Sequence, residues 1–470
     1  MIEFIHILFQ AYFYFVMGYF MLVNVTYATL LIISYREIIR YMRHNTFSNY
    51  RVMVQSELTE PVSILAPAYN EELTVVESVK SLLKLNYAKY EVIVINDGSK
   101  DRTLENLISE FHLFPSKQIY VEQIPTAPVR GIYRSRHPEF RDLIVVDKEN
   151  GGKADALNAG INAARYDYFC AIDADSLLED DALLRVIKPF MEDDTVIAAG
   201  GIVRIVNGCR VVNGRVVQVG LSDRLLPVFQ IVEYFRAFLS GRMAWHGLNA
   251  LLIISGAFGM FKRSAVIEAG GYATDTVGED MELVTRLHRR NREKKEPYKV
   301  VFVPDPVCWT EVPETLRVLA KQRNRWHRGL LDTLLRHRVM VLNPRYGIVG
   351  LGAVPYFLFI ELLGPVLELL GYLCVAVMYV MGILNIEMVI VFFIVALFYG
   401  VMFSVAAVML EEISFKRYPK PMDLAYLLAF GVVENFGYRQ MTVWWRVRAF
   451  VDYFRGVQSW GEMQRRGFRT

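Results

Sequence analysis

Residues 168–181, YFCAIDADSLLEDD, set the frame for the rest of the chain. The apolar start of this stretch, from Tyr168 to Ile172, predicts a short buried strand. That strand delivers two carboxylates, Asp173 and Asp175, at its carboxyl end. Carboxylate oxygens suit the hard cations Mg²⁺ or Mn²⁺, and a diphosphate can supply the remaining ligands. Because Asp-x-Asp recurs by chance on many loops, the neighbouring segments must decide what the pair means.

Two alternations of strand and helix precede this stretch. Apolar runs at Val62–Ala68 and residues 91–95 predict strands, and helical patterns at residues 73–85 and 102–111 follow them. This order predicts a parallel sheet with crossovers, in which ligands bind at the carboxyl ends of the strands. Asp97 follows the second strand, so we expect it to meet a ligand, although a turn or helix cap is the plainer alternative.

Polar residues also follow the first and third predicted strands. Asn70 lies after the first strand, where the N-cap of the next helix belongs. A strand at residues 143–146 leads to Asn150-Gly151-Gly152-Lys153 and then to a predicted helix at residues 154–164. Glycines at such a junction let the backbone approach a phosphate, and Lys153 adds a point charge. The spacing does not fit a Walker motif, which disfavours a P-loop nucleotidase.

Four less regular segments follow their own patterns. Residues 123–141, with prolines and four arginines, indicate a solvated loop. Residues 196–206 and 210–219 can form a hairpin around Asn213-Gly214. Residues 225–239 are amphipathic and suit a membrane surface. The apolar residues 248–261 are too short to span a bilayer, so we expect them to be buried against the membrane-facing side of the domain.

The last soluble segments combine acidic and basic residues. Gly278-Glu279-Asp280 opens a predicted helix at residues 281–290, where a carboxylate is also explained by the helix dipole alone. A strand at residues 299–303 follows. Residues 315–339 then form a long basic amphipathic stretch that contains QRNRW at residues 322–326. Its Arg, Trp and Leu content suits a helix lying in the plane of a membrane interface.

Composition points to a protein that is part aqueous and part membrane. Hydrophobic residues make up 53% of the 470 residues, and the mean hydropathy is +0.25. The net charge of +3 gives no reason to expect a nucleic-acid partner, because Lys and Arg cluster beside apolar segments instead. The four cysteines are scattered, which implies neither a disulfide framework nor a zinc site and fits a reducing compartment.

Apolar segments at both ends are long enough for a bilayer. Residues 4–34 lack signal-peptide features and predict a retained span, and the following Arg36, Arg40 and Arg43 place that end in the cytoplasm. Beyond residue 346, two further spans are predicted. The first ends near residue 384, and the second covers about residues 387–410. A third run, residues 424–436, either spans or re-enters; the basic tail favours a cytoplasmic C-terminus, so the number of crossings stays open.

Three carboxylates are predicted at membrane depth. Burying Glu361, Glu368 and Glu434 there is costly, and such groups usually face a polar path. Glu361 and Glu368 are seven residues apart and share one helix face. We therefore expect that face to line a channel.

Together the segments resemble the processive, membrane-embedded family-2 glycosyltransferases, which include cellulose, hyaluronan, chitin-oligosaccharide and poly-β-1,6-N-acetylglucosamine synthases. The resemblance covers about residues 60 to 340 and the layout of the flanking helices. The motifs that carry it are AYNEE (68–72), NDGS (96–99), NGGKADALN (150–158), DAD (173–175), SGAFGMFKR (255–263), GED (278–280) and QRNRW (322–326). It implies a cytoplasmic α/β catalytic domain of the Rossmann-like GT-A type, joined to transmembrane and interfacial α-helices.

The resemblance also implies roles for single residues. Asp97 contacts the uridine, Lys153 contacts the diphosphate, and Asp280 is the general base. Asp173 helps to hold the nucleotide, and Asp175 binds the metal. The remaining expected substrate contacts are Asn70, Ser255, Gln322, Arg325 and Trp326, of which the last three close over the pyrophosphate and the acceptor sugar. In the family GED usually begins with Thr, so the local loop geometry at Gly278 is open.

The chemistry of these residue types agrees with those roles. Displacing UDP from an anomeric carbon requires that the negative charge on the departing diphosphate be neutralised. A divalent cation, Lys153 and Arg325 would do this. The attacking hydroxyl loses its proton to a carboxylate on the opposite face, and direct displacement converts a UDP-α-sugar into a β-linkage. Trp326 offers an aromatic face for a sugar ring, although Trp is also common as an anchor at bilayer interfaces.

Three interpretations follow. The favoured one is a processive synthase that polymerises a β-linked polysaccharide, with UDP-N-acetylglucosamine as the best candidate donor, and exports it through its own helices. The alternatives are a transferase that adds one sugar to a membrane lipid, and a non-catalytic translocation or sensing protein. The expected partners are the UDP-sugar, the growing polysaccharide, the lipid bilayer and accessory secretion subunits. The expected location is the plasma membrane, with several passes and a cytoplasmic catalytic domain.

The predicted domains are a transmembrane helix and linker (1–44), the catalytic domain (45–312), the interfacial helix (313–345), and the C-terminal membrane region with its basic tail (346–470).

Overall fold

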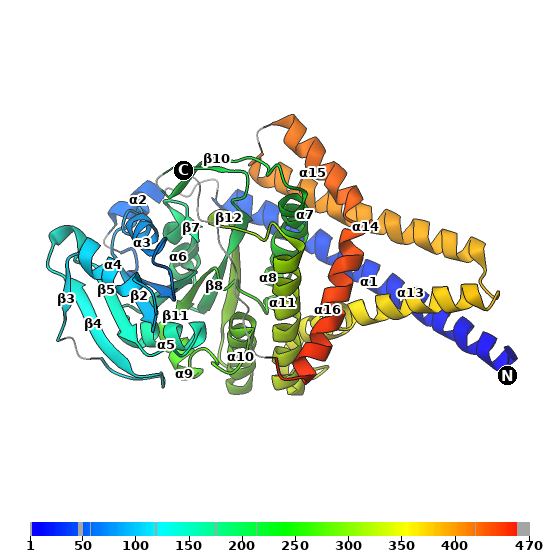
Figure 1. Cartoon of the computed structure of the whole chain (residues 1–470), viewed down its shortest axis with the longest axis horizontal. Helices are drawn as coiled ribbons and strands as arrows, with labels where there is room; N and C mark the ends of the chain where they lie inside the picture. The colour runs from blue at the N-terminus through cyan, green and yellow to red at the C-terminus, as the bar shows by residue number, and fades with distance from the viewer. Residues whose placement is uncertain are drawn as a thin grey trace.

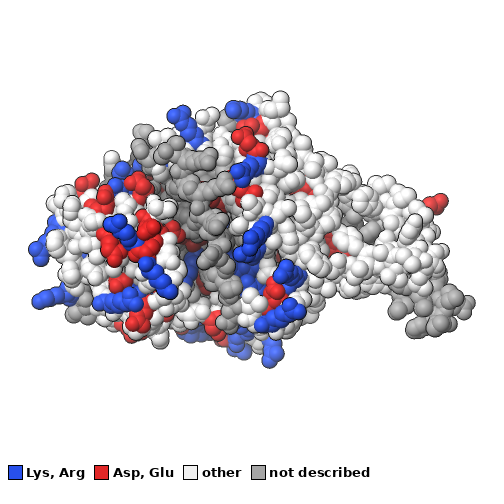
Figure 2. All heavy atoms as spheres, in the orientation of Figure 1, with Lys and Arg blue, Asp and Glu red and all other residues white. Residues whose placement is uncertain are grey.

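The computed structural model describes residues 2–45, 50–56, 58–117, 120–173, 176–212, 214–418 and 420–457. An α/β domain occupies one side of the molecule, and three long helices, α1 (Ile2–Asn45), α13 (Gly364–Val380) and α14 (Ile386–Phe415), project from the other (Figure 1). On the face shown in Figure 2, Lys, Arg, Asp and Glu gather over the α/β domain and are sparse over the projecting helices. This separation is expected when one part of a chain meets water and the other meets lipid.

The α/β domain is built on one mixed sheet. Within the described residues its strand order is β3-β4-β5-β2-β1-β6-β11-β8-β12-β7. The strands are β1 (Val62–Ala68), β2 (Tyr90–Asp97), β3 (Leu113–Pro115), β4 (Val129–Ser135), β5 (Leu143–Lys148), β6 (Tyr168–Ile172), β7 (Leu177–Leu178), β8 (Val196–Ile205), β11 (Phe258–Lys262) and β12 (Lys299–Thr310). A separate hairpin pairs β9 (Arg210–Val212) with β10 (Arg215–Gln218).

The centre of the sheet has the predicted parallel arrangement. Strands β5, β2, β1 and β6 run parallel, in a register that aligns Ala68 with Asn96 and Asn96 with Asp147. Their crossover helices are α3 (Val75–Leu82), α4 (Thr103–Glu110) and α5 (Lys153–Ala163). The strands are buried because their Val, Ile, Leu and Ala side chains are covered on both faces. The loops that carry the polar motifs therefore leave the sheet at one edge.

Several expected elements differ from the structure. Residues 123–141 are not an irregular loop throughout, because β4 lies within them and pairs antiparallel with β5. Strand β8 is not part of the predicted hairpin; it joins the main sheet between β11 and β12, and only β9 and β10 form the hairpin. The apolar residues 248–261 are buried as expected, but they end in β11, an inner strand of the sheet. Long-range pairing, which local patterns do not encode, decided all three.

A layer of helices connects the sheet to the projecting helices. It contains α7 (Leu225–Tyr234), a π-helical segment at Phe235–Gly241, α8 (Arg242–Gly247) and α10 (Glu279–Lys294). The predicted interfacial helix is α11 (Leu316–Arg336), and α16 (Tyr438–Phe454) packs along it (Figure 1). Both helices run across the direction of α1, α13 and α14 in this view.

Three stretches are long and apolar enough to cross a membrane within the part of the chain that the structure describes. They are Gln10–Asn45, Val349–Val380 and Val389–Phe415. The third C-terminal apolar run forms a helix shorter than these stretches, because α15 (Pro421–Val433) has 13 residues and a break at Gly437 separates it from α16. The basic tail that argued for a cytoplasmic C-terminus lies outside the described residues.

Candidate functional site

A single cavity of about 2360 Å³ joins the carboxyl edge of the sheet to the space between the projecting helices. At the sheet end it is lined by Asn70, Asp97, Lys153, Asp173, Ser255 and Asp280. Gln322, Arg325 and Trp326 line its middle. Glu361, Glu368 and Glu434 line its far end. The predicted site residues that the structure describes therefore share one cavity.

Asp97 is buried at the end of β2. Its carboxylate accepts hydrogen bonds from Lys148 Nζ at 2.8 Å, from the backbone of Gly151 at 3.0 Å and from the backbone of Gly152 at 2.8 Å. Asn150 Nδ2 adds a further contact at 3.2 Å. Asp97 therefore braces the glycine loop, and its expected contact with a uridine remains a prediction.

Lys153 begins α5, directly after Gly152, whose φ of 87° lies in the left-handed region that glycine adopts without strain. Its ammonium group pairs with the Asp173 carboxylate and donates to the carbonyl of Gly256 at 3.2 Å. Burial alone would lower the pKa of Lys153, but the charges of Asp173 and Glu279 outweigh it and raise that pKa. A permanent cation at a helix N-terminus is suited to a diphosphate.

Asp173 is the described half of the predicted metal pair. Its side chain is 30% exposed and lines the cavity. Asp175 lies outside the described residues, and within the described ones no group of three His, Cys, Asp or Glu side chains is close enough to hold a metal. An accessible carboxylate facing an open cavity fits a hard cation whose other ligands come from a substrate.

Asp280 begins α10 close to Lys153 and opposite Gly256. Its Oδ2 accepts a hydrogen bond from the Gly256 backbone at 3.1 Å, and its Oδ1 accepts one from the Met281 backbone at 2.8 Å. A side chain at Gly256 would crowd Lys153, because its Cβ would lie 3.0 Å from Nζ, and it would be in ordinary contact with Asp280 at 3.6 Å. The glycine therefore leaves room for the Lys153 ammonium group beside the Asp280 carboxylate.

Glu279 lines the site, although no separate role was predicted for it from sequence. It lines the same cavity, is 5% exposed and lies 3.9 Å from Lys153 Nζ. Burial raises the pKa of Glu279 to about 7, with Asp280 adding to the rise and Lys153 opposing it. The GED motif contains Glu279, so its presence near the site could be predicted. Two adjacent carboxylates at the start of a helix do not show which of them points into the cavity.

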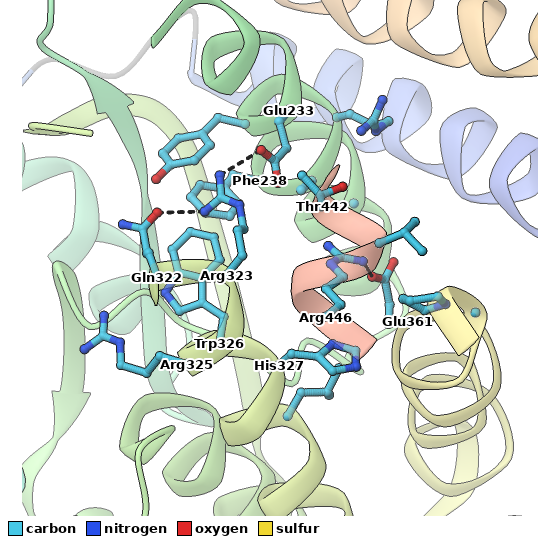
Figure 3. A pocket seen from close by; sticks show the side chains of 18 of the residues that line it. Glu233, Phe238, Gln322, Arg323, Arg325, Trp326, His327, Glu361, Thr442 and Arg446 are labelled. Atoms are coloured by element: carbon cyan, nitrogen blue, oxygen red, sulfur yellow. Dashed lines mark hydrogen bonds and ion pairs between the residues drawn. The ribbon is translucent and has the colours of Figure 1, made fainter. Parts of the chain in front are cut away.

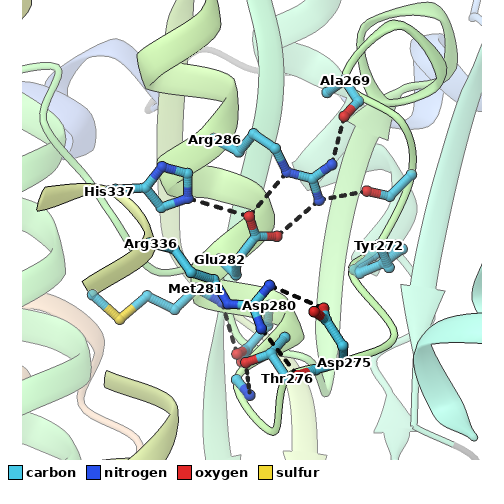
Figure 4. Close-up of polar contacts among 12 residues, drawn as sticks. Ala269, Tyr272, Asp275, Thr276, Asp280, Met281, Glu282, Arg286, Arg336 and His337 are labelled. Carbon is cyan, nitrogen blue, oxygen red and sulfur yellow. Dashed lines mark hydrogen bonds and ion pairs between the residues drawn. The ribbon is translucent and has the colours of Figure 1, made fainter. Parts of the chain in front are cut away.

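The GED loop is held from behind by charged contacts (Figure 4). Glu282 accepts from Arg286 at 3.0 and 2.8 Å and lies 3.2 Å from His337 Nε2. Arg286 also donates to the carbonyls of Ala269 and Gly271. Arg336 pairs with Asp275 at 2.9 Å. These contacts join the start of α10 to the end of α11, so Asp280 and the QRNRW helix are held in a fixed relation.

The departure from Thr at Gly278 has a steric reason. A Cβ on Gly278 would lie 2.8 Å from Cα of Gly329, and a Cβ on Gly329 would lie 2.8 Å from Cα of Gly278. Real Cβ atoms essentially never come that close. Two glycines therefore allow α11 to touch the loop that carries Asp280.

Some QRNRW residues of α11 make buried contacts within the protein, and others border the cavity (Figure 3). Arg323 is 1% exposed, donates to Glu233 at 2.7 Å and to Gln322 at 2.8 Å, and lies over the Trp326 ring at 4.3 Å from its centroid. One face of Trp326 is thus covered by a guanidinium, and Phe238 lies against the ring at a centroid distance of 6.3 Å. Trp326 remains 37% exposed, and Arg325 also borders the cavity.

Asn70 and Ser255 line the cavity at its sheet end. Asn70 is not the predicted N-cap, because α3 begins at Val75 with Thr74 in the cap position. Instead, Asn70 has a φ of 55°, its side-chain oxygen accepts from the Lys100 backbone at 2.8 Å, and its backbone N–H donates to Ser99 Oγ at 3.0 Å. It therefore ties the AYNEE loop to the NDGS loop.

The far end of the cavity is lined by matched charges. Glu361 pairs with Arg446 at 3.8 Å, Glu368 with Arg439 at 3.3 Å, and Glu434 with Arg236 at 2.5 Å. The first two carboxylates are seven residues apart, and so are their arginines on α16. The expected shared face of Glu361 and Glu368 is therefore present, and both residues border the cavity.

Comparison with known proteins agrees with this architecture. A family described as "Glycosyltransferase like family 2" matches residues 60–329, and one described as "Chitin synthase" matches residues 274–465. A poly-beta-1,6-N-acetyl-D-glucosamine synthase of Staphylococcus aureus strain COL is 34% identical over 278 residues, which cover 59% of this chain and 56% of that protein. The synthase of Staphylococcus epidermidis is 33% identical over 61% of this chain and 59% of its own length.

The match thus spans somewhat more than half the length of these curated relatives. Among solved structures, a mannosyltransferase from Pyrobaculum calidifontis, in complex with GDP-Man and Mn²⁺, superposes with a TM-score of 0.51 at 18% identity, over 93% of this chain and 99% of that one. This likeness concerns the fold, and it confirms the predicted α/β GT-A architecture with attached apolar helices. Because the first family match covers more than half of the chain, the protein belongs to the family-2 glycosyltransferases.

Proposed function

We propose that the protein is a processive, inverting glycosyltransferase that builds a β-linked polysaccharide from a UDP-sugar. The observation that carries the proposal is the single cavity, which contains a base, a cation and a carboxylate at one end and passes between apolar helices at the other. An enzyme that released each product to water would have no use for the second half. The synthase relatives favour UDP-N-acetylglucosamine as the donor.

In this proposal the residues at the sheet end divide the work. Lys153 binds the diphosphate and neutralises charge as it departs, and Arg325 approaches the same group from α11. Asp280 takes the proton of the attacking hydroxyl. Asp173 and Asp175 would hold a divalent cation, Mg²⁺ or Mn²⁺, which supplies Lewis-acid stabilisation of the leaving diphosphate. Asp97 keeps the glycine loop in the position from which the N-terminus of α5 faces the phosphates.

We further propose that the polymer leaves through the far end of the cavity. The charges there support an uncharged product, because Glu361, Glu368 and Glu434 are each matched by one arginine. A lining with no net charge neither attracts nor retains an anionic chain. This agrees with a neutral amino-sugar polymer and disfavours a polymer of uronic acids.

The proposed location is the plasma membrane, with the catalytic domain in the cytoplasm. Three crossings place the N-terminus outside and the C-terminus inside. The basic residues after the first and last spans, among them Arg36, Arg40, Arg43, Lys416 and Arg417, then all face the cytoplasm. Accessory secretion subunits belong to the same proposal, as in the expectations from sequence.

A product assay tests the function. Purified full-length protein in phospholipid nanodiscs is incubated with radiolabelled UDP-sugars and a divalent cation, and the product is sized. The proposal requires long polymer from one donor. A labelled lipid of fixed size would favour the single-sugar transferase, and absence of UDP release with every donor would favour a non-catalytic role.

A further inference from the structure

Arg242 is a buried cation to which neither the motifs nor the comparisons give a role. It begins α8, lines the cavity and is 4% exposed. Its guanidinium lies over the ring of Phe238, 4.0 Å from the centroid, and is 5.9 Å from that of Phe302. In the described part of the chain neither its Nε nor its Nη1 has a hydrogen-bond partner.

Unpaired N–H groups of a buried guanidinium are costly. Moving a charged donor out of water without a new hydrogen-bond acceptor destabilises the folded protein. Contacts between the cation and aromatic rings offset only part of that cost. Other described arginines, such as Arg204, have one buried nitrogen without a hydrogen-bond partner, whereas Arg242 has two and no ion pair with a described carboxylate. Burial lowers the pKa of Arg242 to about 10, with Asp280 opposing the change, so the side chain remains a cation at neutral pH. It can donate hydrogen bonds but cannot act as the base.

The position of Arg242 separates it from the diphosphate end. Asp280 interacts electrostatically with both Lys153 and Arg242. Lys153 forms an ion pair with Asp173. Arg242 instead lies over the ring of Phe238, which in turn contacts the ring of Trp326. Asp280 is therefore within electrostatic reach of two cations, and one of them, Arg242, contacts an aromatic residue that packs against Trp326.

We propose that Arg242 is a specificity-determining residue of the acceptor subsite, where its guanidinium donates hydrogen bonds to oxygen atoms of the terminal sugar of the growing chain. The matching chemistry is a hydroxyl or an amide carbonyl oxygen, both of which accept from a planar guanidinium. This inference rests on the proposed polymerase function. It explains how a chain end is oriented so that one hydroxyl faces Asp280.

The test separates acceptor use from donor use. Wild-type protein, R242M and R242K are placed in phospholipid nanodiscs with radiolabelled UDP-N-acetylglucosamine and a β-linked N-acetylglucosamine trisaccharide as acceptor. R242M should raise the KM for the trisaccharide about 10- to 100-fold, the loss expected for a hydrogen bond with a charged donor. The KM for the UDP-sugar and the Kd for UDP should change less than about twofold. UDP released per sugar transferred should rise, because water then competes with a poorly held acceptor.

Two controls keep the test sharp. R242K retains the charge and should give an intermediate KM, which also serves if R242M does not fold. R204K changes another buried arginine, one that pairs with Glu411 outside the cavity lining, and should behave as wild type. An unchanged trisaccharide KM overturns the inference, and so does a parallel rise in the KM for the donor and the Kd for UDP. Absence of polymer from the wild type with every donor would instead refute the proposed function.

Discussion

Replacing Gly329 with alanine is expected to push α11 away from the loop that carries Asp280. The new Cβ would lie 2.8 Å from Cα of Gly278, whereas ordinary contacts begin at 3.4 Å, so the two backbones must separate by about 0.6 Å. Neither partner can yield by rotating a side chain, because the obstacle is backbone. Overpacking of this kind costs about 1–3 kcal/mol of stability.

The same shift should reduce activity. Gln322, Arg325 and Trp326 move with α11, while Lys153 and Asp173 stay with the sheet. Misplacing reacting groups by about 1 Å can cost about 100-fold in rate, so a shift of roughly half that size should lower kcat about tenfold. Incorporation of radiolabelled sugar gives kcat, and thermal unfolding of the same nanodisc sample gives the change in Tm.

A reciprocal variant and a matched control identify the cause. Gly278→Ala should have the same effect, because the contact is mutual and the φ of −129° at Gly278 suits alanine without backbone strain. Gly18→Ala, in α1, places a Cβ that meets nothing within 4 Å and should leave both kcat and Tm unchanged. If Gly329→Ala retained the kcat and the Tm of the wild type, close packing of α11 against the GED loop would not be what positions the site.

Four further predictions follow from the same cavity. Asp280→Asn should abolish polymerisation while UDP still binds by calorimetry; unchanged turnover would remove Asp280 from the mechanism. Because the pKa of Glu279 is raised to about 7 in the fold, its protonated form stabilises the protein below about pH 4.5, and that contribution is lost as pH rises through 7. Glu279→Gln should therefore flatten the fall in Tm between pH 5 and pH 8 in ligand-free protein; an unchanged slope would contradict this. Chelation of divalent cations should stop sugar transfer, with activity returning on addition of Mg²⁺ or Mn²⁺; full activity in chelator would exclude the metal role of Asp173. Changing Glu361 and Glu368 together to Gln should leave UDP release initially intact but slow the appearance of polymer inside inverted vesicles, since Arg446 and Arg439 lose their partners; undiminished export would count against a channel at that face.

Local pattern was sufficient for the elements that position most of the site. The parallel strands β1, β2, β5 and β6 were predicted because their apolar runs end in polar loops, and the parallel order then forces those loops to one edge. The three spans were predicted because a helix of about 20 consecutive apolar residues matches the thickness of a bilayer and is rare in domains surrounded by water. Asp97, Lys153 and Asp173 follow the carboxyl ends of these strands or begin the next helix, so they line the cavity at this edge.

What local pattern left undecided depends on contacts between distant residues. Strand β4 and the inner position of β11 depend on pairing partners that periodicity does not specify. The inward position of Glu279 and the unpaired edge of Arg242 exist only once α8 and α10 pack beside the sheet.

The amino-acid sequence by itself determined the central strands, the long apolar helices and the order of both along the chain, because strand and helix periodicity and apolar length are properties of consecutive residues. Only the tertiary structure decided that Gly278 must meet Gly329, that Glu361 and Glu368 are each matched by an arginine of α16, and that one cavity joins these groups. The physical reason is that close packing and charge pairing are properties of residues far apart in the chain that become neighbours only in the folded molecule.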